Sequence, residues 1–276
     1  MLRVVLTLLV ALSFSFSHKL IATTYPVYYP LYYIAKGRQN VDVLIKTQAD
    51  PHHYELTPKD AQRLIEADLV FTLGVEGWEE NILRDLPKGR VVLLKDGISF
   101  VKYGKFPDPH IWLSPREYAI LIKNVKEALL RYDPQSKAYY QKRYEEYMQK
   151  LVKLERAFAN TLKNCKYRTI VSTHRAWDYL AKDYNLRTVS LTGVHAEEEP
   201  RPSEIMMIIQ TVKREGIKYI FAELGQDKKV ADFIASQTGA KVLLLNSSLF
   251  PRRYSDNYFT IMEENLKVLK EGLQCR

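Results

Sequence analysis

The sequence predicts an α/β protein of two lobes, each a mostly parallel sheet flanked by helices, joined by one long rigid helix. Short β-branched runs alternate with helical patterns up to residue 113, and the alternation returns after residue 165. Between them, residues 114–164 contain no strand pattern and no Gly- or Ser-rich linker. Alternation of this kind is typical of βαβ units. We therefore expect a first lobe at 18–113, linking helices at 114–164 and a second lobe at 165–276.

The chain begins with a segment typical of a signal peptide. Arg3 precedes an apolar run at 4–16, and Ser15-Phe16-Ser17 offers a small-x-small cleavage site before His18. A run of about 13 residues is too short to span a membrane. A buried strand or helix would not account for the leading arginine. We expect residues 1–17 to be removed and the mature protein to be periplasmic. Because the two cysteines lie far from the cleavage region, at 165 and 275, we expect the protein not to be lipid-anchored.

Four buried strands and their intervening helices are expected in the first lobe. The strands are short apolar, β-branched runs at 20–24, 41–45, 69–73 and 91–94. A helix is expected at 58–67, because Thr57 can cap its N-terminus and Pro58 suits its first turn. Strands separated by helices form a parallel sheet that is covered on both faces.

A long helix at 136–162 is expected to join the lobes. Apolar side chains recur in it every three or four residues, which predicts one packed face about 40 Å long. These side chains are Tyr140, Tyr144, Tyr147, Leu151, Leu154 and Phe158. In the second lobe, strands are expected at 169–172, 187–191, 219–222 and 241–245, followed by a helix at 255–271.

Composition excludes several classes of protein. An apolar fraction of 46% in 276 residues excludes a disordered chain. Two cysteines cannot build a zinc finger or an iron–sulfur site. In an oxidising compartment Cys165 and Cys275 either pair or remain two buried thiols. The net charge of +9 is not gathered in Lys/Arg blocks longer than a dipeptide, so no nucleic-acid partner is expected.

Three histidines lie where predicted strands end. His52 follows the second strand, His110 the fourth, and His174 the first strand of the second lobe. Each alone is consistent with a hydrogen-bonded loop residue. However, open α/β sheets bind ligands at the carboxyl ends of their strands, and two lobes facing one cleft would bring the three imidazoles together. Neutral imidazole suits Zn²⁺, and the Asp-Pro-His sequence at both His52 and His110 strengthens the hypothesis of a metal site.

Four segments, at 50–60, 108–115, 172–186 and 221–243, resemble the cluster A-I metal-binding proteins of ABC importers. These are periplasmic zinc- and manganese-uptake proteins, and the resemblance covers nearly the whole mature chain. It implies a metal ion buried between two lobes, little hinge motion and delivery to an inner-membrane ABC permease. On the family pattern, His52, His110 and His174 occupy the first three ligand positions.

The fourth ligand position departs from the family pattern. Many members carry a carboxylate after the last sheet strand, where this chain has Asn246, whose amide oxygen is a poor zinc ligand. Water or another carboxylate would then complete the site. Glu223, at the end of a predicted strand, is either that ligand or a residue that orients a ligand imidazole, and we favour the second role. Three nitrogen donors favour Zn²⁺ over Mn²⁺, which prefers oxygen. The His/Asp-rich loop of many zinc members is absent, because 97–106 contains no His or acid.

Several neighbours of these histidines are expected to shape the site. Trp112 and Trp177 are expected to pack beneath it as a dry wall. Arg175 either opposes a dication or turns outward to a carboxylate. His53 is expected at the rim. His195, with the acids at 197–199, is expected at a solvated lobe edge.

Two classes of function compete for a three-histidine site. The first is a monomeric, non-catalytic carrier that captures a divalent metal, Zn²⁺ or alternatively Mn²⁺, for an importer. The second is a zinc hydrolase with Glu223 as general base. No HExxH or similar local signature of a zinc hydrolase is present, and we therefore expect a carrier and not an enzyme. Binding of an organic solute would need aromatic and polar groups in the cleft in place of convergent histidines.

Overall fold

A computed structural model of the chain describes residues 19–46, 52, 54–193 and 200–276. The predicted signal peptide, His53 and the segment 195–199 lie outside the described residues. No described helix is both long enough and apolar enough to cross a membrane.

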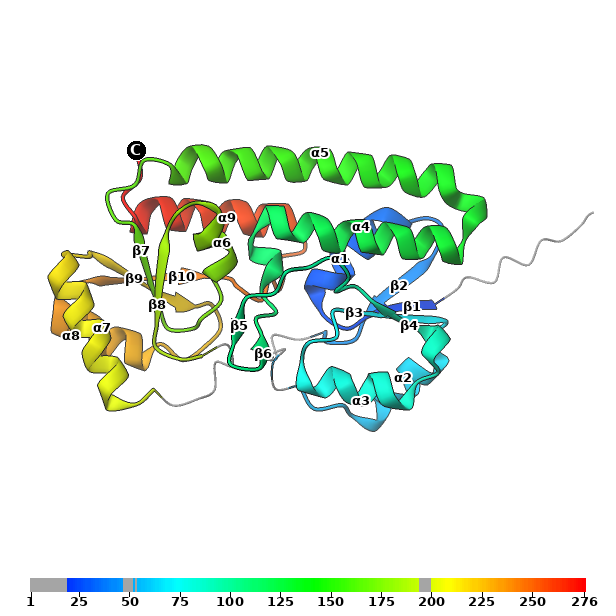
Figure 1. The fold of residues 1–276 in the computed structure, drawn as a ribbon, viewed down its shortest axis with the longest axis horizontal. Coiled ribbons are helices and arrows are strands. Elements are labelled where there is room, and N and C mark those ends of the chain that lie inside the picture. Colours follow the sequence, from blue (N-terminus) through cyan, green and yellow to red (C-terminus); the bar gives the residue numbers. More distant parts are fainter. Residues whose placement is uncertain (1–18, 47–51, 53, 194–199) are drawn as a thin grey trace, which may run out of the picture.

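Two four-stranded parallel sheets form the two lobes, which confirms the predicted fold class (Figure 1). The first sheet has the order β2-β1-β3-β4 and the second the order β10-β9-β7-β8, so both use the same topology when counted from their own first strand. The strands of the first sheet are β1 (Lys19–Ala22), β2 (Asn40–Val43), β3 (Leu69–Thr72) and β4 (Val91–Leu93). Those of the second are β7 (Thr169–Ser172), β8 (Arg187–Ser190), β9 (Tyr219–Glu223) and β10 (Lys241–Leu245).

Helices cover both sheets because the central strands are apolar on both faces. Every residue of β3 and of β7 is buried. In the first lobe, α1 (Tyr25–Ala35) lies on one side of the sheet, and α2 (Pro58–Glu66) and α3 (Gly77–Asp85) lie on the other (Figure 1). The helices of the second lobe are α6 (Asp178–Asp183), α7 (Pro202–Glu215), α8 (Lys229–Thr238) and α9 (Tyr258–Gly272).

The N-terminus of α2 has the predicted cap. The Thr57 hydroxyl accepts the Asp60 N–H at 3.2 Å, and an Asp60 carboxylate oxygen accepts the Thr57 N–H at 3.1 Å. Pro58 occupies the first turn, where no intrahelical partner for its missing N–H is needed. This cap fixes the start of α2, six residues after His52.

One long helix, α5, runs along both lobes as predicted (Figure 1). It extends over Lys137–Leu162 and is preceded by α4 (Pro115–Tyr132) and a short 3-10 turn, η4 (Pro134–Ser136). The Tyr147 ring lies 5.2 Å from the ring of Tyr33 in α1 and 5.0 Å from that of Phe259 in α9. The same helix therefore packs on both lobes, and one continuous hydrophobic cluster extends from Leu20 to Leu273.

Smaller elements complete the chain. They are the 3-10 turns η2 (Lys88–Arg90) and η3 (Ile111–Leu113) and the antiparallel hairpin of β5 (Lys102–Tyr103) and β6 (Phe106–Pro107). Cys165, after α5, and Cys275, after α9, form a disulfide, which decides between the paired and free-thiol alternatives.

Candidate metal centre

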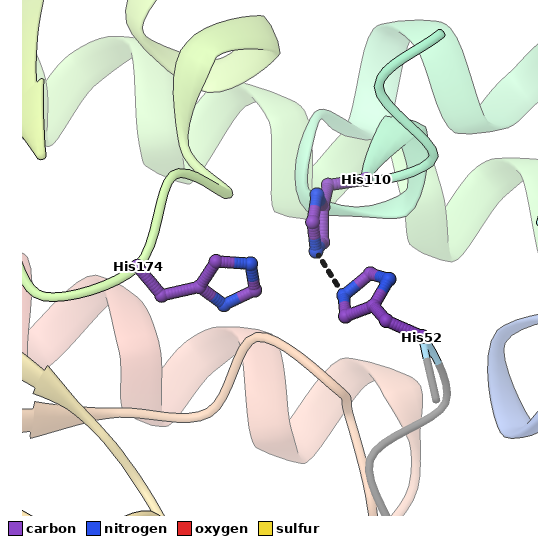
Figure 2. Close-up of side chains that lie close together, drawn as sticks. All are labelled: His52, His110 and His174. Atoms are coloured by element: carbon purple, nitrogen blue, oxygen red, sulfur yellow. Dashed lines mark hydrogen bonds between the residues drawn. The ribbon is translucent and has the colours of Figure 1, made fainter. Parts of the chain in front are cut away.

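The three predicted histidines converge from three separate segments (Figure 2). His52 lies between β2 and α2, His110 caps η3, and His174 follows the end of β7. Their exposed fractions are 8%, 1% and 5%, so all three are buried. Because each lies beyond the carboxyl end of a strand, the site occupies the position that parallel sheets offer to ligands.

The imidazole rings point toward a common centre. One ligand nitrogen from each ring lies within 4.8 Å of the other two. The Nε2 atoms of His52 and His110 are 3.1 Å apart, near the ~3.3 Å separation of two nitrogens on a tetrahedral zinc ion. The ring centroids of the three pairs are 4.8, 4.9 and 5.4 Å apart. This spacing suits one metal ion held by three nitrogens.

Two carboxylates orient two of these imidazoles. His52 Nδ1 lies 2.9 Å from Glu76 Oε1, and His110 Nδ1 lies 2.7 Å from Asp108 Oδ1. A carboxylate that accepts the Nδ1 proton leaves the Nε2 lone pair free for a metal. Both Nε2 atoms are turned toward the centre, so the tautomers that these contacts favour are the ones a metal ion needs.

Sequence reasoning missed both orienting carboxylates. Asp108 is the first residue of the Asp-Pro-His motif, and its position two residues before His110 is the available signal. Glu76 gave no such signal, because an acidic residue at the start of a helix is usually explained by the helix dipole. Only the fold brings it to His52.

A third carboxylate holds the loop that carries Glu76. Glu79 is 1% exposed and accepts hydrogen bonds from the Thr23 and Thr72 hydroxyls through Oε1. Its Oε2 accepts the backbone N–H groups of three consecutive residues, Gly74, Val75 and Glu76, at 2.9, 3.0 and 3.2 Å. Burial raises the pKa of Glu79. The buried side chain of Glu79 therefore holds the loop between β3 and α3 in place.

The surroundings of the histidines are electrostatically suited to a cation. Burial raises the pKa of Asp108 to about 7 and that of Glu223 to about 7. The neighbouring His52 opposes both shifts, which places both carboxyls within electrostatic reach of the imidazoles. A dication at the centre would offset the cost of burying these groups as anions.

Glu223, at the end of β9, and Asn246 both form hydrogen bonds with the loop after β10. Glu223 Oε1 accepts the Ser247 N–H at 3.0 Å. The Asn246 side-chain amide donates to the Phe250 carbonyl at 3.1 Å, and its oxygen accepts from the Ser248 hydroxyl. Among the described residues, the cluster of possible metal ligands with ligand atoms within 4.8 Å of one another is formed by the three histidines, and Glu223 is not part of it.

Of the neighbours that the sequence singles out, Trp112 contacts a ligand histidine. The Trp112 ring lies 5.3 Å from that of His110 and its Nε1–H donates to the Ser247 carbonyl at 2.7 Å. Trp177 is 2% exposed. Arg175 lies over the Tyr103 ring at 4.6 Å, with its Nε 4.0 Å from an Asp178 carboxylate oxygen, and its charge still opposes the raised pKa of Asp108.

Known proteins resemble this chain over nearly its whole length. A family model described as "Zinc-uptake complex component A periplasmic", ZnuA, matches residues 20–272. The high-affinity zinc uptake system protein ZnuA of Bacillus subtilis is 30% identical, over 92% of this chain and 86% of ZnuA. The zinc-binding lipoprotein AdcA of Streptococcus pneumoniae is 29% identical over 91% of this chain, which spans 55% of AdcA.

A solved structure supports the same relationship. The Zn(II)-bound ZnuA-like domain of Streptococcus pneumoniae AdcA matches with a TM-score of 0.80 at 29% identity, over 93% of this chain and 99% of that domain. The family model covers far more than half of the chain, and the fold agrees with that of the matched domain. The chain therefore belongs to the ZnuA family, the periplasmic component A of zinc-uptake complexes, whose members are solute-binding proteins of metal uptake and not enzymes.

Proposed function

We propose that this protein captures Zn²⁺ between its lobes through His52, His110 and His174 and delivers it to an inner-membrane ABC permease. The observation that carries the proposal is the convergence of three buried imidazoles within 4.8 Å. Three buried imidazoles from separate segments each present one nitrogen to a common centre, which is the arrangement that a single metal ion requires.

Zinc is preferred over manganese by the chemistry of the donors. Neutral imidazole nitrogen suits Zn²⁺, whereas Mn²⁺ favours carboxylate, carbonyl and water oxygen. The outer carboxylates Glu76 and Asp108 contact imidazole nitrogens, so they strengthen nitrogen ligation instead of replacing it. The relatives named above, ZnuA and AdcA, are named for zinc.

The fourth coordination position is assigned to water, with Glu223 as an outer carboxylate near it. Glu223 is 8% exposed and already accepts the Ser247 N–H. Direct ligation by Glu223 is the alternative. Asn246 is the weaker candidate because its amide is engaged within its own loop and an amide oxygen is a poor zinc donor.

The protein is further proposed to act as a secreted monomer without a nucleic-acid partner. The segment that would carry a signal peptide or an anchor lies outside the described residues. AdcA of Streptococcus pneumoniae is named a lipoprotein. The unanchored form proposed for this chain differs from that relative.

Metal content and affinity test this function together. Native mass spectrometry of the protein purified with zinc should show one zinc ion per chain, and a chelator competition should give a defined Kd. His110→Ala should weaken zinc binding at least tenfold, because a four-coordinate site loses one of its three protein nitrogens. Circular dichroism of the metal-free variant should show an intact fold. Unchanged affinity in His110→Ala, or an organic molecule in place of zinc, would refute the proposal.

A further inference from the structure

The hairpin before His110 is closed at its base by a residue of the other lobe. Within the hairpin, Asp108 donates its N–H to the Val101 carbonyl at 2.8 Å, which brings the two ends together. The Tyr179 hydroxyl, from α6 in the second lobe, donates to the Asp108 carbonyl at 2.7 Å and accepts the Val101 N–H at 3.0 Å. One hydroxyl therefore bonds to both ends of the hairpin.

Tyr179 is built into the interior at this point. Its side chain is 1% exposed, and both of its hydrogen bonds cross from the second lobe to the segment between β4 and α4. It lies five residues after His174. Arg175, in the same short segment, adds a second contact to the hairpin through the Tyr103 ring at 4.6 Å. The segment that carries one histidine thus also holds the hairpin that leads to another.

The contacts continue from Tyr179 to the imidazole of His110. The carbonyl of Asp108 accepts the hydrogen bond from the Tyr179 hydroxyl. The Oδ1 atom of Asp108 accepts the backbone N–H of His110 at 3.0 Å and lies 2.7 Å from His110 Nδ1. Asp108 is fully buried, so it has little freedom to restore these contacts after a shift of its backbone. A displacement of Asp108 would therefore rotate the His110 ring.

We propose that Tyr179 is a positioning residue that aligns His110 with His174 by holding Asp108 across the lobe boundary. The inference rests on the proposed function, because it concerns the affinity of the same three-histidine site. Tyr179 does not touch the metal. Its role is to make two ligands from different lobes behave as one preformed unit, which reduces the ordering needed when zinc binds.

The first test replaces the hydroxyl alone. Tyr179→Phe should raise the zinc Kd about five-fold, the equivalent of one hydrogen bond of ~1 kcal/mol, and should speed zinc dissociation correspondingly. Tyr184→Phe is the matched control. Tyr184 follows α6 and is 7% exposed, and its hydroxyl has no hydrogen-bond partner in the described part of the chain. This control should leave the zinc Kd unchanged.

A double-mutant cycle separates positioning from general destabilisation. Asp108→Ala keeps the carbonyl that Tyr179 binds but removes the carboxylate that links Asp108 to the His110 ring, so adding Tyr179→Phe in that background should change the zinc Kd less than two-fold. A merely structural role would weaken binding by the same factor in both backgrounds. Thermal unfolding of each metal-free variant, compared with Tyr184→Phe, shows whether the fold is kept.

The outcomes also distinguish this inference from the proposed function. If the wild type binds no zinc, both fail. If the wild type binds zinc and His110→Ala weakens it, but Tyr179→Phe does not, only the role of Tyr179 is overturned. Equal factors in the two backgrounds of the cycle overturn it as well.

Discussion

Removing the charge of Glu76 tests whether the carboxylates around the histidines matter for zinc affinity. Glu76→Gln keeps the shape of the side chain and an oxygen that can accept the His52 Nδ1 proton. The contact spans 2.9 Å, and the two side chains are only 3% and 7% exposed, so water cannot easily replace the lost charge. The substitution therefore isolates the electrostatic contribution of one buried carboxylate.

The expected loss can be bounded from the geometry. A carboxylate on the far side of an imidazole lies ~6 Å from a metal on Nε2, where a unit charge and a dication interact by about 5 kcal/mol at an effective dielectric of 20. Part of this is offset, because the metal-free protein also gains when a buried anion is removed. Loss of outer carboxylates of metal-bound histidines typically costs 10- to 100-fold in affinity, or about 1.4–2.7 kcal/mol. We expect Glu76→Gln to fall in this range.

Chelator competition at fixed pH and ionic strength measures the effect directly. The matched control is Glu80→Gln, which removes the same charge from an exposed position on the same helix, α3. Long-range charge effects on the surface are screened within about 8 Å at physiological salt, so the control should stay within two-fold of wild type. If Glu76→Gln behaves like Glu80→Gln, the reasoning about buried carboxylates is wrong.

Four further predictions concern the carboxyls near the histidines, the disulfide and Glu79. Burial raises the pKa of Asp108 and Glu223 to about 7, and zinc favours their ionised forms. Zinc binding should therefore release protons and weaken as the pH falls below 7. Calorimetry in buffers of different ionisation enthalpy measures the number of protons released. The same shifts mean that the folded metal-free protein binds more protons than the unfolded chain, so its stability should fall as the pH rises from about 4 to 7, and pH-independent urea unfolding would contradict this. Reducing the disulfide between Cys165 and Cys275, which are 110 residues apart, should cost about 4–5 kcal/mol of stability and lower the thermal midpoint by roughly 10 °C. Glu79→Ala should destabilise the fold by about 3 kcal/mol, because it leaves three backbone N–H groups without their acceptor, and a loss below 1 kcal/mol in denaturant unfolding would show that water replaces it.

The sheet architecture and the three histidines could be predicted because both depend on local patterns. Buried parallel strands are continuous apolar runs, and the runs at 69–73 and 169–172 became β3 and β7 within a residue of their expected ends. The position of a histidine just beyond such a run says at which edge of a sheet it lies. By that rule the sequence predicts that His174 shares a site with His52 and His110, which lie more than 60 positions away in the chain.

Other features have no local signature. Helix α1 contains Pro30 in its interior, which normally argues against a helix, yet its tyrosines are held by packing on α5. The strands β5 and β6 have two residues each, too few for an alternating pattern. The role of Tyr179 also depends on contacts between lobes, so no window of sequence around it could reveal that role.

The carboxylates around the histidines explain how a buried site can be stable with and without its metal. With zinc bound as proposed, the dication is balanced by anionic groups that contact or neighbour the imidazoles. When zinc leaves, the same groups would remain as uncompensated charges in the interior, a state that costs several kcal/mol per ion. The pKa values near 7 of Asp108 and Glu223 reduce this cost, because a proton bound to either carboxyl replaces part of the charge of the metal. We therefore expect protons to replace part of the charge of zinc when the metal leaves this molecule, whose two halves share one continuous core and one long helix.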